Sequence, residues 1–293
     1  MLFMMSSVVL LSCDAPLGQV PDAQVSAEES EQTAEVLAAT LGDRTAGWSM
    51  DLYDMVGTLR EDTLVHEMAS RAARVSHNPN STWRGAVSNY ELTYDESDHT
   101  HHVSYLREGI ETSLSTSLEA SNMYVYEDGA GERLQMPALS NVYSITFAAE
   151  QQGESTVEAS SSDVLEAHTF NRKAEWHLLQ EADPMELQGA QRQEGILVDG
   201  SERRLNYDVT FETVDVTINR VDRHVGSADL PLYALTSGIL RFQMDLTLEE
   251  TGSPTRITGR IILEPEQPAT IKIEGSERNF SVDLDSGTTL PHS

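Results

Sequence analysis

The chain has 293 residues, which is enough for one large domain with a hydrophobic core of its own. It carries 19 Lys and Arg against 48 Asp and Glu, a formal net charge of −29 at pH 7. Such a chain repels phosphate groups, which excludes nucleic acid as a partner and also an anionic lipid surface recognised by charge alone.

The first residues form a short apolar segment that ends at the only cysteine. The run from Leu2 to Leu11 is much shorter than the roughly 20 residues of a membrane-spanning helix and is typical of the apolar region of a signal peptide. The next residues complete the sequence Leu10-Leu11-Ser12-Cys13, which resembles the lipobox of bacterial lipoproteins. A single cysteine cannot form an intramolecular disulfide, so Cys13 is free for another role.

This resemblance implies export and lipid anchoring. In bacterial lipoproteins the cysteine thiol is alkylated by diacylglycerol and the signal peptide is cut just before it, so Leu10 and Ser12 would fit the signal peptidase and Cys13 would become the lipidated first residue. We therefore predict a signal peptide at 1–12 and a protein of the cell envelope that faces the periplasm or the exterior. Its partner is then a bacterial membrane, through the lipid anchor, and the choice between inner and outer membrane stays open.

Two segments precede the main domain. Residues 13–26 contain Pro16, Gly18 and Pro21, which predicts a flexible tether that follows the lipidated cysteine. Residues 27–78 are predicted to be helical. Ser26 and Glu29 form a capping box for a helix near 27–41, and a second apolar periodicity runs over 49–75, where Gly57 is expected to break the helix in two.

From Trp83 onward the apolar period changes from helical to two, which predicts strands over 83–290. The alternation is clearest at Tyr90–Tyr94, Tyr143–Phe147, Leu205–Phe211, Leu240–Leu248 and Phe280–Leu284. Apolar residues change parity between Phe211 and Val214, so we expect a bulge or tight turn near Glu212 and Thr213. Residues 153–163, rich in Ser and Glu, are predicted to form a loop.

These patterns predict a mainly β (α+β) fold: N-terminal helices followed by an antiparallel meander sheet. The connections are too short for the crossovers that parallel strands need. The apolar face of the sheet must be covered by a second sheet, as in a sandwich, by the sheet's own curvature, as in a half-barrel, or by the two helices.

The sequence contains only an incomplete version of one catalytic motif. His66-Glu67-Met68-Ala69-Ser70 begins like a zinc-protease helix, but Ser70 stands where the second histidine ligand must be. No nucleophile elbow and no phosphate-binding loop occurs. We therefore predict no enzyme activity, no catalytic residue and no cofactor.

One histidine cluster suggests metal chemistry. Residues Asp95 to His102 contain His99, His101 and His102 among three carboxylates, and imidazole with carboxylate suits zinc. The alternative is a solvated acidic loop between two strands, which we prefer because adjacent ligands alone seldom close a tetrahedral site. We therefore expect no bound metal. Asp283, Asp285 and Gly287 are likewise interpreted as a turn, because the later acidic ligand of a calcium loop is missing.

Three functional hypotheses follow. The first is a non-catalytic lipoprotein whose β-rich domain binds a protein partner or has a structural role in the envelope. The alternative is a carrier of lipid or another hydrophobic ligand, because a curved antiparallel sheet with helices across its mouth is similar in plan to periplasmic lipoprotein carriers. A metal-dependent enzyme built around the three histidines ranks third. Nucleic acid is not an expected partner in any of them.

Overall fold

A computed structural model of the chain describes two helices followed by strands. The described residues are 25–42, 45–57, 85–111, 114–137, 141–158, 165–180, 184–198, 203–219, 236–248 and 252–290. The signal peptide, Cys13 and the tether up to residue 24 lie outside these ranges, as do residues 58–78 of the predicted helical segment. Neither described helix combines the length and apolar character needed to cross a lipid bilayer.

Helix α1 spans Ala27–Leu41 and begins at the predicted capping box. The Glu29 N–H donates to the Ser26 hydroxyl at 3.1 Å, and the Ser26 N–H donates to the Glu29 carboxylate at 2.9 Å. These hydrogen bonds hold the pKa of Glu29 below its usual value. Helix α2 spans Trp48–Gly57 and forms the start of the second predicted helical region.

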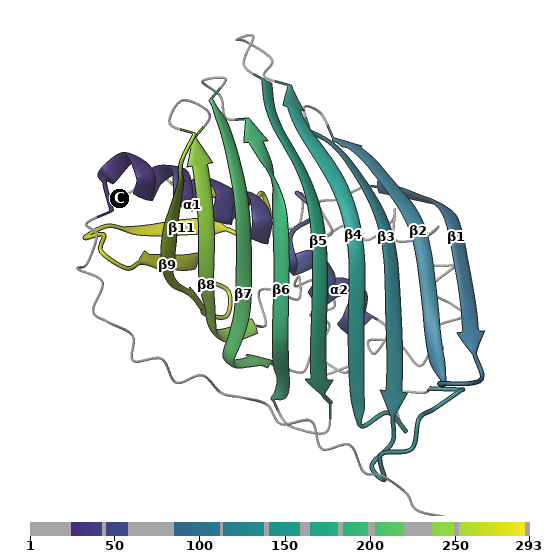
Figure 1. Cartoon of the computed structure of the whole chain (residues 1–293). Helices are drawn as coiled ribbons and strands as arrows, with labels where there is room; N and C mark the ends of the chain where they lie inside the picture. The colour runs from purple at the N-terminus through teal and green to yellow at the C-terminus, as the bar shows by residue number, and fades with distance from the viewer. Residues whose placement is uncertain are drawn as a thin grey trace, which may run out of the picture.

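All the described strands belong to one antiparallel meander. The sheet has twelve strands in sequential order, so each strand pairs with its neighbours in the chain. The predicted meander is confirmed, and within the described residues it forms a single open sheet rather than a sandwich or a closed barrel (Figure 1). The strands are β1 Gly85–Asp95, β2 Thr100–Glu111, β3 Leu114–Glu127, β4 Ser144–Glu158, β5 Leu165–Leu179, β6 Met185–Val198, β7 Arg204–Ile218, β8 Thr236–Leu248, β9 Pro254–Leu263, β10 Ala269–Ile273, β11 Asn279–Asp283 and β12 Thr288–Leu290.

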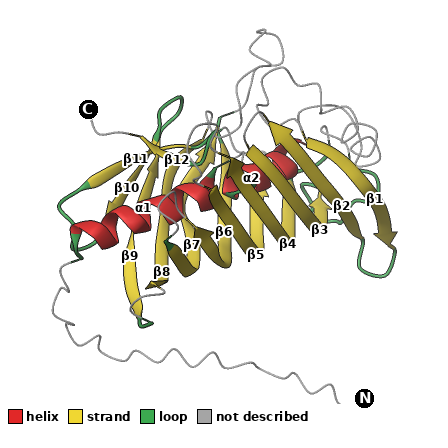
Figure 2. Cartoon of the chain, turned by 90° about the horizontal axis from the view of Figure 1, so that it is seen from above, coloured by secondary structure: helices red, strands yellow, loops and turns green. Residues whose placement is uncertain are grey.

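The two helices cover one face of the sheet, which we call the inner face; the opposite face is the outer face. Figure 2 shows α1 and α2 following one another along the sheet, across the strands. Helix α1 contacts β7 on one side and β11 and β12 on the other. Its apolar residues Ala34, Leu37 and Leu41 are completely buried. The last strands of the sheet therefore enclose α1 within the core.

The end of α1 packs backbone to backbone against the turn before β12. A Cβ built on Gly42 would lie 2.3 Å from the Cα of Gly287, so a side chain at either glycine would push the two segments apart. The hydroxyl of Thr45 donates to the carbonyl oxygens of Ala39 and Gly42 and so ties the following loop to the helix end.

Alternating burial along the strands follows the predicted pattern. Leu205, Tyr207, Val209 and Phe211 of β7 all lie on the inner face and are buried. The parity change is also confirmed, because the register of β7 with β8 shifts between Val214 and Thr217 and Asp215 has a φ of 54°. This bulge lies about two residues beyond the predicted position. It returns Val216 and Ile218 to the core.

Glycines alternate with aromatic residues in one row that crosses the middle of the sheet. Gly153 of β4, Phe170 of β5, Gly195 of β6 and Tyr207 of β7 are successive register partners. A Cβ on Gly153 would lie 2.5 Å from the Phe170 ring, and one on Gly195 would lie 2.6 Å from the Tyr207 hydroxyl oxygen. Each glycine thus leaves the space that its neighbour's ring occupies.

The predicted loop at 153–163 is wrong over its first half. Strand β4 continues to Glu158, and Gly153 and Ser155 are register partners of Phe170 and His168 in β5. Polar composition suggested a loop, but Ser155 is an inner-face residue and Glu154 an outer-face residue of a regular strand. Residues 159–164 lie outside the described part of the chain.

Candidate functional site

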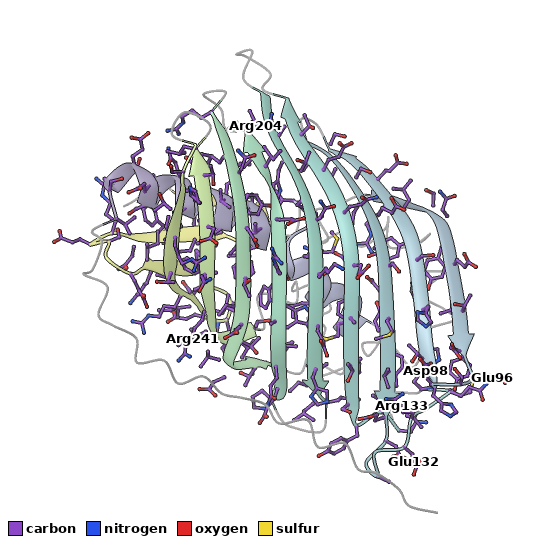
Figure 3. All side chains as sticks on the ribbon, in the orientation of Figure 1. Glu96, Asp98, Glu132, Arg133, Arg204 and Arg241 are labelled. Carbon is purple, nitrogen blue, oxygen red and sulfur yellow. The ribbon has the colours of Figure 1, made fainter. Side chains whose placement is uncertain are left out.

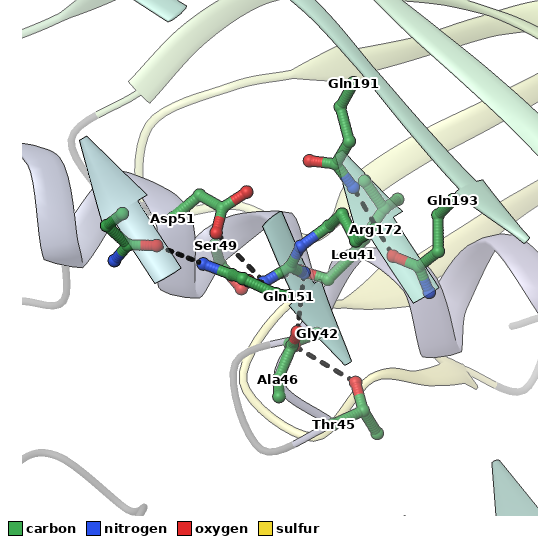
Figure 4. A network of polar contacts seen from close by, with 11 residues as sticks. Leu41, Gly42, Thr45, Ala46, Ser49, Asp51, Gln151, Arg172, Gln191 and Gln193 are labelled. Carbon is green, nitrogen blue, oxygen red and sulfur yellow. Dashed lines mark hydrogen bonds and ion pairs between the residues drawn. The ribbon is translucent and has the colours of Figure 1, made fainter. Parts of the chain in front are cut away.

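A buried polar network crosses the inner face, centred on Arg172 of β5 (Figure 4). Arg172 lies in register between Gln151 of β4 and Gln193 of β6. All three side chains are buried, with 1%, 4% and 0% exposure respectively. A guanidinium at such a position requires partners for its charge and its donors, since the penalty for burying an unpaired charge is several kcal/mol, to order of magnitude.

Helix α2, the loop before it and strand β4 supply those partners. The Arg172 guanidinium donates to the Asp51 carboxylate at 2.9 Å, to the carbonyl oxygen of Ala46 at 2.6 Å, and to the side-chain oxygen of Gln151. Both side chains of the ion pair are completely buried. Gln151 in turn donates to Asn122 of β3 at 3.2 Å. The network thus fixes α2 to β3, β4 and β5.

A second branch runs from β6 to β7 and back to β5. Gln191 donates to Gln193 at 3.4 Å, and Gln193 donates to the Tyr207 hydroxyl at 2.8 Å. That hydroxyl lies 2.5 Å from Nε2 of His168. Burial, with a smaller contribution from the Arg172 charge, lowers the pKa of His168 to about 3, so the imidazole is neutral at pH 7, and its tautomer decides which of the two groups donates. Burial also raises the pKa of the Tyr207 hydroxyl.

The network around Arg172 is suited to holding helix α2 and the strands from β3 to β7 together. The carboxylate of Asp51 is engaged by Arg172, and the low basicity of His168 suppresses proton uptake near neutral pH. Sequence analysis did not identify this network. The available signal was in β5, where Arg172 interrupts an inner-face alternation of Phe170, Ala174 and Trp176.

The three candidate metal-binding histidines do not form one site, although the rings of His99 and His101 both lie near the Tyr94 ring, with centroids at 6.2 and 4.8 Å. His101 is buried, with Nε2 3.1 Å from the carbonyl oxygen of Gln135, whereas His102 is exposed. His99 lies in the turn between β1 and β2, with a φ of 58° and Nδ1 2.6 Å from the Tyr94 hydroxyl. Within the described ranges, no group of three or more His, Cys, Asp and Glu residues could hold a metal ion.

The acidic segment around these histidines forms a hydrogen-bonded turn. Asp95 accepts from the backbone and hydroxyl of Ser97, and Asp98 accepts from the Thr100 N–H at 3.1 Å. The Arg133 guanidinium donates to the Asp98 carbonyl oxygen at 2.6 Å, at the end of the sheet where Glu96 and Glu132 also lie (Figure 3). The carboxylates of Asp95 and Asp98 therefore organise the turn between β1 and β2.

The remaining predicted sites either lie outside the described residues or form a turn. Cys13, Leu10 and Ser12 lie outside the described residues. Asp283 accepts from the Asp285 N–H at 2.9 Å and from the Ser286 hydroxyl at 3.1 Å, and Gly287 has a φ of 69°. The segment from Asp283 to Gly287 is therefore a turn between β11 and β12, as its sequence indicates.

Comparisons with protein-family models, curated proteins and solved structures find no match to this chain. Its function therefore has to be inferred from its own residues. The two features of the structure that carry information on function are the packing of the inner face and the polar surface of the outer face.

Proposed function

We propose that this chain is an exported lipoprotein, anchored to a bacterial membrane through Cys13, whose β-rich domain is a non-catalytic binding or structural module of the cell envelope. The lipobox-like sequence supports the anchor and the location. One observation supports the role of the domain: the apolar inner face of β7 to β11 is filled by protein side chains.

A carrier of a hydrophobic molecule needs apolar wall residues that its own core leaves uncovered. Phe242, Met244, Leu246 and Phe280 are the residues that would line such a space, and their exposed fractions are 3%, 0%, 2% and 5%. They belong to one hydrophobic cluster with Leu37 of α1. Close packing of this kind favours a binding or structural module over a carrier.

Titration of the delipidated protein with a fluorescent fatty acid and a fluorescent phospholipid tests this proposal. We expect no saturable binding. Saturable one-to-one binding would favour the carrier, provided that it is lost in Met244→Phe, which narrows the inner space, and kept in Thr210→Phe on the outer face of the neighbouring strand. Circular dichroism of both variants would establish that they remain folded.

A further inference from the structure

The outer face carries a groove that runs across the strands. It has a volume of about 590 Å³ and extends from β2 to β7. Its floor is the backbone of the glycine–aromatic row, in which Gly153 and Gly195 alternate with Phe170 and Tyr207. Because the side chains of this row point to the inner face, the groove lies between two neighbouring rows of outward side chains.

Register pairing identifies the two walls. One wall is formed by residues that are successive partners from β2 to β6, namely Leu106, Glu119, Gln152, Asn171 and Glu194. The other wall is formed by successive partners from β3 to β6, namely Ser117, Glu154, Thr169 and Ile196. The groove is thus lined by three carboxylates, by amide and hydroxyl groups between them, and by an aliphatic residue in each wall.

Three carboxylates elsewhere on the outer face, those of Glu150, Asp208 and Asp245, are paired with cations. Glu150 pairs with Lys173 at 2.7 Å, and Asp245 pairs with Arg256 at 2.8 Å. No Lys or Arg is among the described residues that line the groove. Arg192, two positions from Glu194 in β6, is bonded to both carboxylate oxygens of Asp208, at 2.9 and 2.6 Å, and it also attracts Glu194 electrostatically from outside the lining. The described lining therefore carries three carboxylates and no cation of its own.

The spacing of the charges fits an extended polypeptide. Glu119 and Glu194 are three strands apart, which at about 4.8 Å per strand is roughly 14 Å. Two side chains four residues apart on an extended chain are separated by about 13 Å and point to the same side. A spacing of this size is too wide for both carboxylates to ligate one ion, since oxygen ligands lie about 2.0 to 2.6 Å from Ca²⁺ or Mg²⁺.

We propose that this groove binds an extended, cationic segment of a partner protein, with lysine or arginine side chains against Glu119, Glu154 and Glu194. The Gln152 amide donates to the Glu119 carboxylate at 2.5 Å and so orients it, while the amide of Asn171 and the hydroxyls of Ser117 and Thr169 can exchange hydrogen bonds with the partner's backbone. Leu106 and Ile196 can contact the aliphatic parts of its side chains. This inference rests on the proposed binding role of the domain, which it extends to a site and a class of partner.

The probe is a fluorescent ten-residue peptide with lysines four residues apart, added to the delipidated protein and followed by fluorescence anisotropy. The test variant is Glu119→Gln/Glu154→Gln/Glu194→Gln. The matched control is Glu175→Gln/Glu186→Gln/Glu212→Gln, which removes the same number of exposed carboxylates from the same face outside the groove. Both variants have the same net charge, so a diffuse attraction would weaken equally in both.

We expect saturable binding that the groove variant weakens about tenfold and the control variant changes less than twofold, with a marked loss of affinity at higher salt. Equal weakening in the two variants would overturn the proposal, because it would mean attraction to net charge alone. Equal binding of a peptide with serine in place of lysine, or no binding at all, would also overturn it. None of these results affects the fatty-acid titration, which tests the packed inner face separately.

Discussion

Asp51 of α2 and Arg172 of β5 form a completely buried ion pair, although 121 residues separate them in the sequence. The pair joins a helix near the N-terminus to the middle of the sheet. Arg172 also donates to the Ala46 carbonyl oxygen and to Gln151, so one guanidinium engages the loop before α2, the helix itself and strand β4. A change at either charge should therefore affect the attachment of α2.

We expect Arg172→Met to lower the free energy of unfolding by about 3–5 kcal/mol, because the Asp51 carboxylate would remain buried without its cation. Asp51→Leu should have a similar cost for the converse reason. The double variant should lose clearly less than the sum of the two, since no uncompensated charge remains. Urea denaturation followed by tryptophan fluorescence measures all three.

An exposed ion pair that involves Lys173, the residue after Arg172, provides the control for these three variants. Lys173 and Glu150 are also bonded, at 2.7 Å, but their side chains are 76% and 71% exposed. Lys173→Met should cost less than about 1 kcal/mol. A cost for Arg172→Met as small as that for Lys173→Met would contradict the interpretation of the buried pair as a fixing point for α2.

The buried imidazole of His168 should make the fold sensitive to mild acid. Its pKa is about 3 in the folded protein against 6.5 for the free side chain. Between these two values the unfolded chain binds more protons than the native protein, so the free energy of unfolding falls as the pH falls below 6.5. The slope is at most about 1.4 kcal/mol per pH unit.

Replacing His168 with Gln, which keeps a polar group near the Tyr207 hydroxyl, should flatten this dependence between pH 6.5 and 4.5. Carboxylates contribute mainly below that window. His102→Gln is the control, because His102 is exposed at the outer surface. Urea denaturation at several pH values gives the slopes, and identical slopes for wild type and His168→Gln would exclude His168 as the titrating group.

The glycine–aromatic row makes a separate prediction about packing. In Gly195→Ala the new Cβ would lie 2.3 Å from the Thr169 carbonyl oxygen and 2.6 Å from the Tyr207 hydroxyl oxygen. We expect a loss of about 1–3 kcal/mol, as for other overpacked cores. Gly129→Ala is the matched control, because the nearest atom to its Cβ would be a Tyr143 ring carbon at 3.8 Å. Comparable melting temperatures for the two variants would contradict this account.

The local sequence pattern was sufficient to predict those structural features whose interacting residues are close together in the sequence. Ser26 and Glu29 are three residues apart, and their capping box starts α1 where it was predicted. The parity change after Phe211 likewise predicted a bulge, because an apolar residue on the wrong face must be returned to the core.

The sites depend on pairing across the sheet, which sequence spacing does not reveal. Charged residues are seldom fully buried, so neither Asp51 nor Arg172 was an expected core residue. The groove likewise depends on two register rows of outward side chains, and those rows are known only once β3, β4, β5 and β6 are aligned. The polar stretch from Gly153 to Glu158 was predicted to be a loop for the same reason, since its burial depends on strands β3 and β5.

The membrane anchor gives the last prediction. A chain with a net charge of −29 is repelled by anionic lipid, so its attachment to a membrane should depend on the acyl chains expected on Cys13. Each buried methylene contributes about 0.8 kcal/mol, and two or more chains hold a protein stably. In a bacterial host, wild-type protein should partition into the detergent phase and resist extraction by high salt. Cys13→Ala should remain unprocessed or enter the aqueous phase, whereas Ser7→Ala, within the apolar run, should behave as wild type. Aqueous partitioning of both wild type and Cys13→Ala would exclude the lipid anchor.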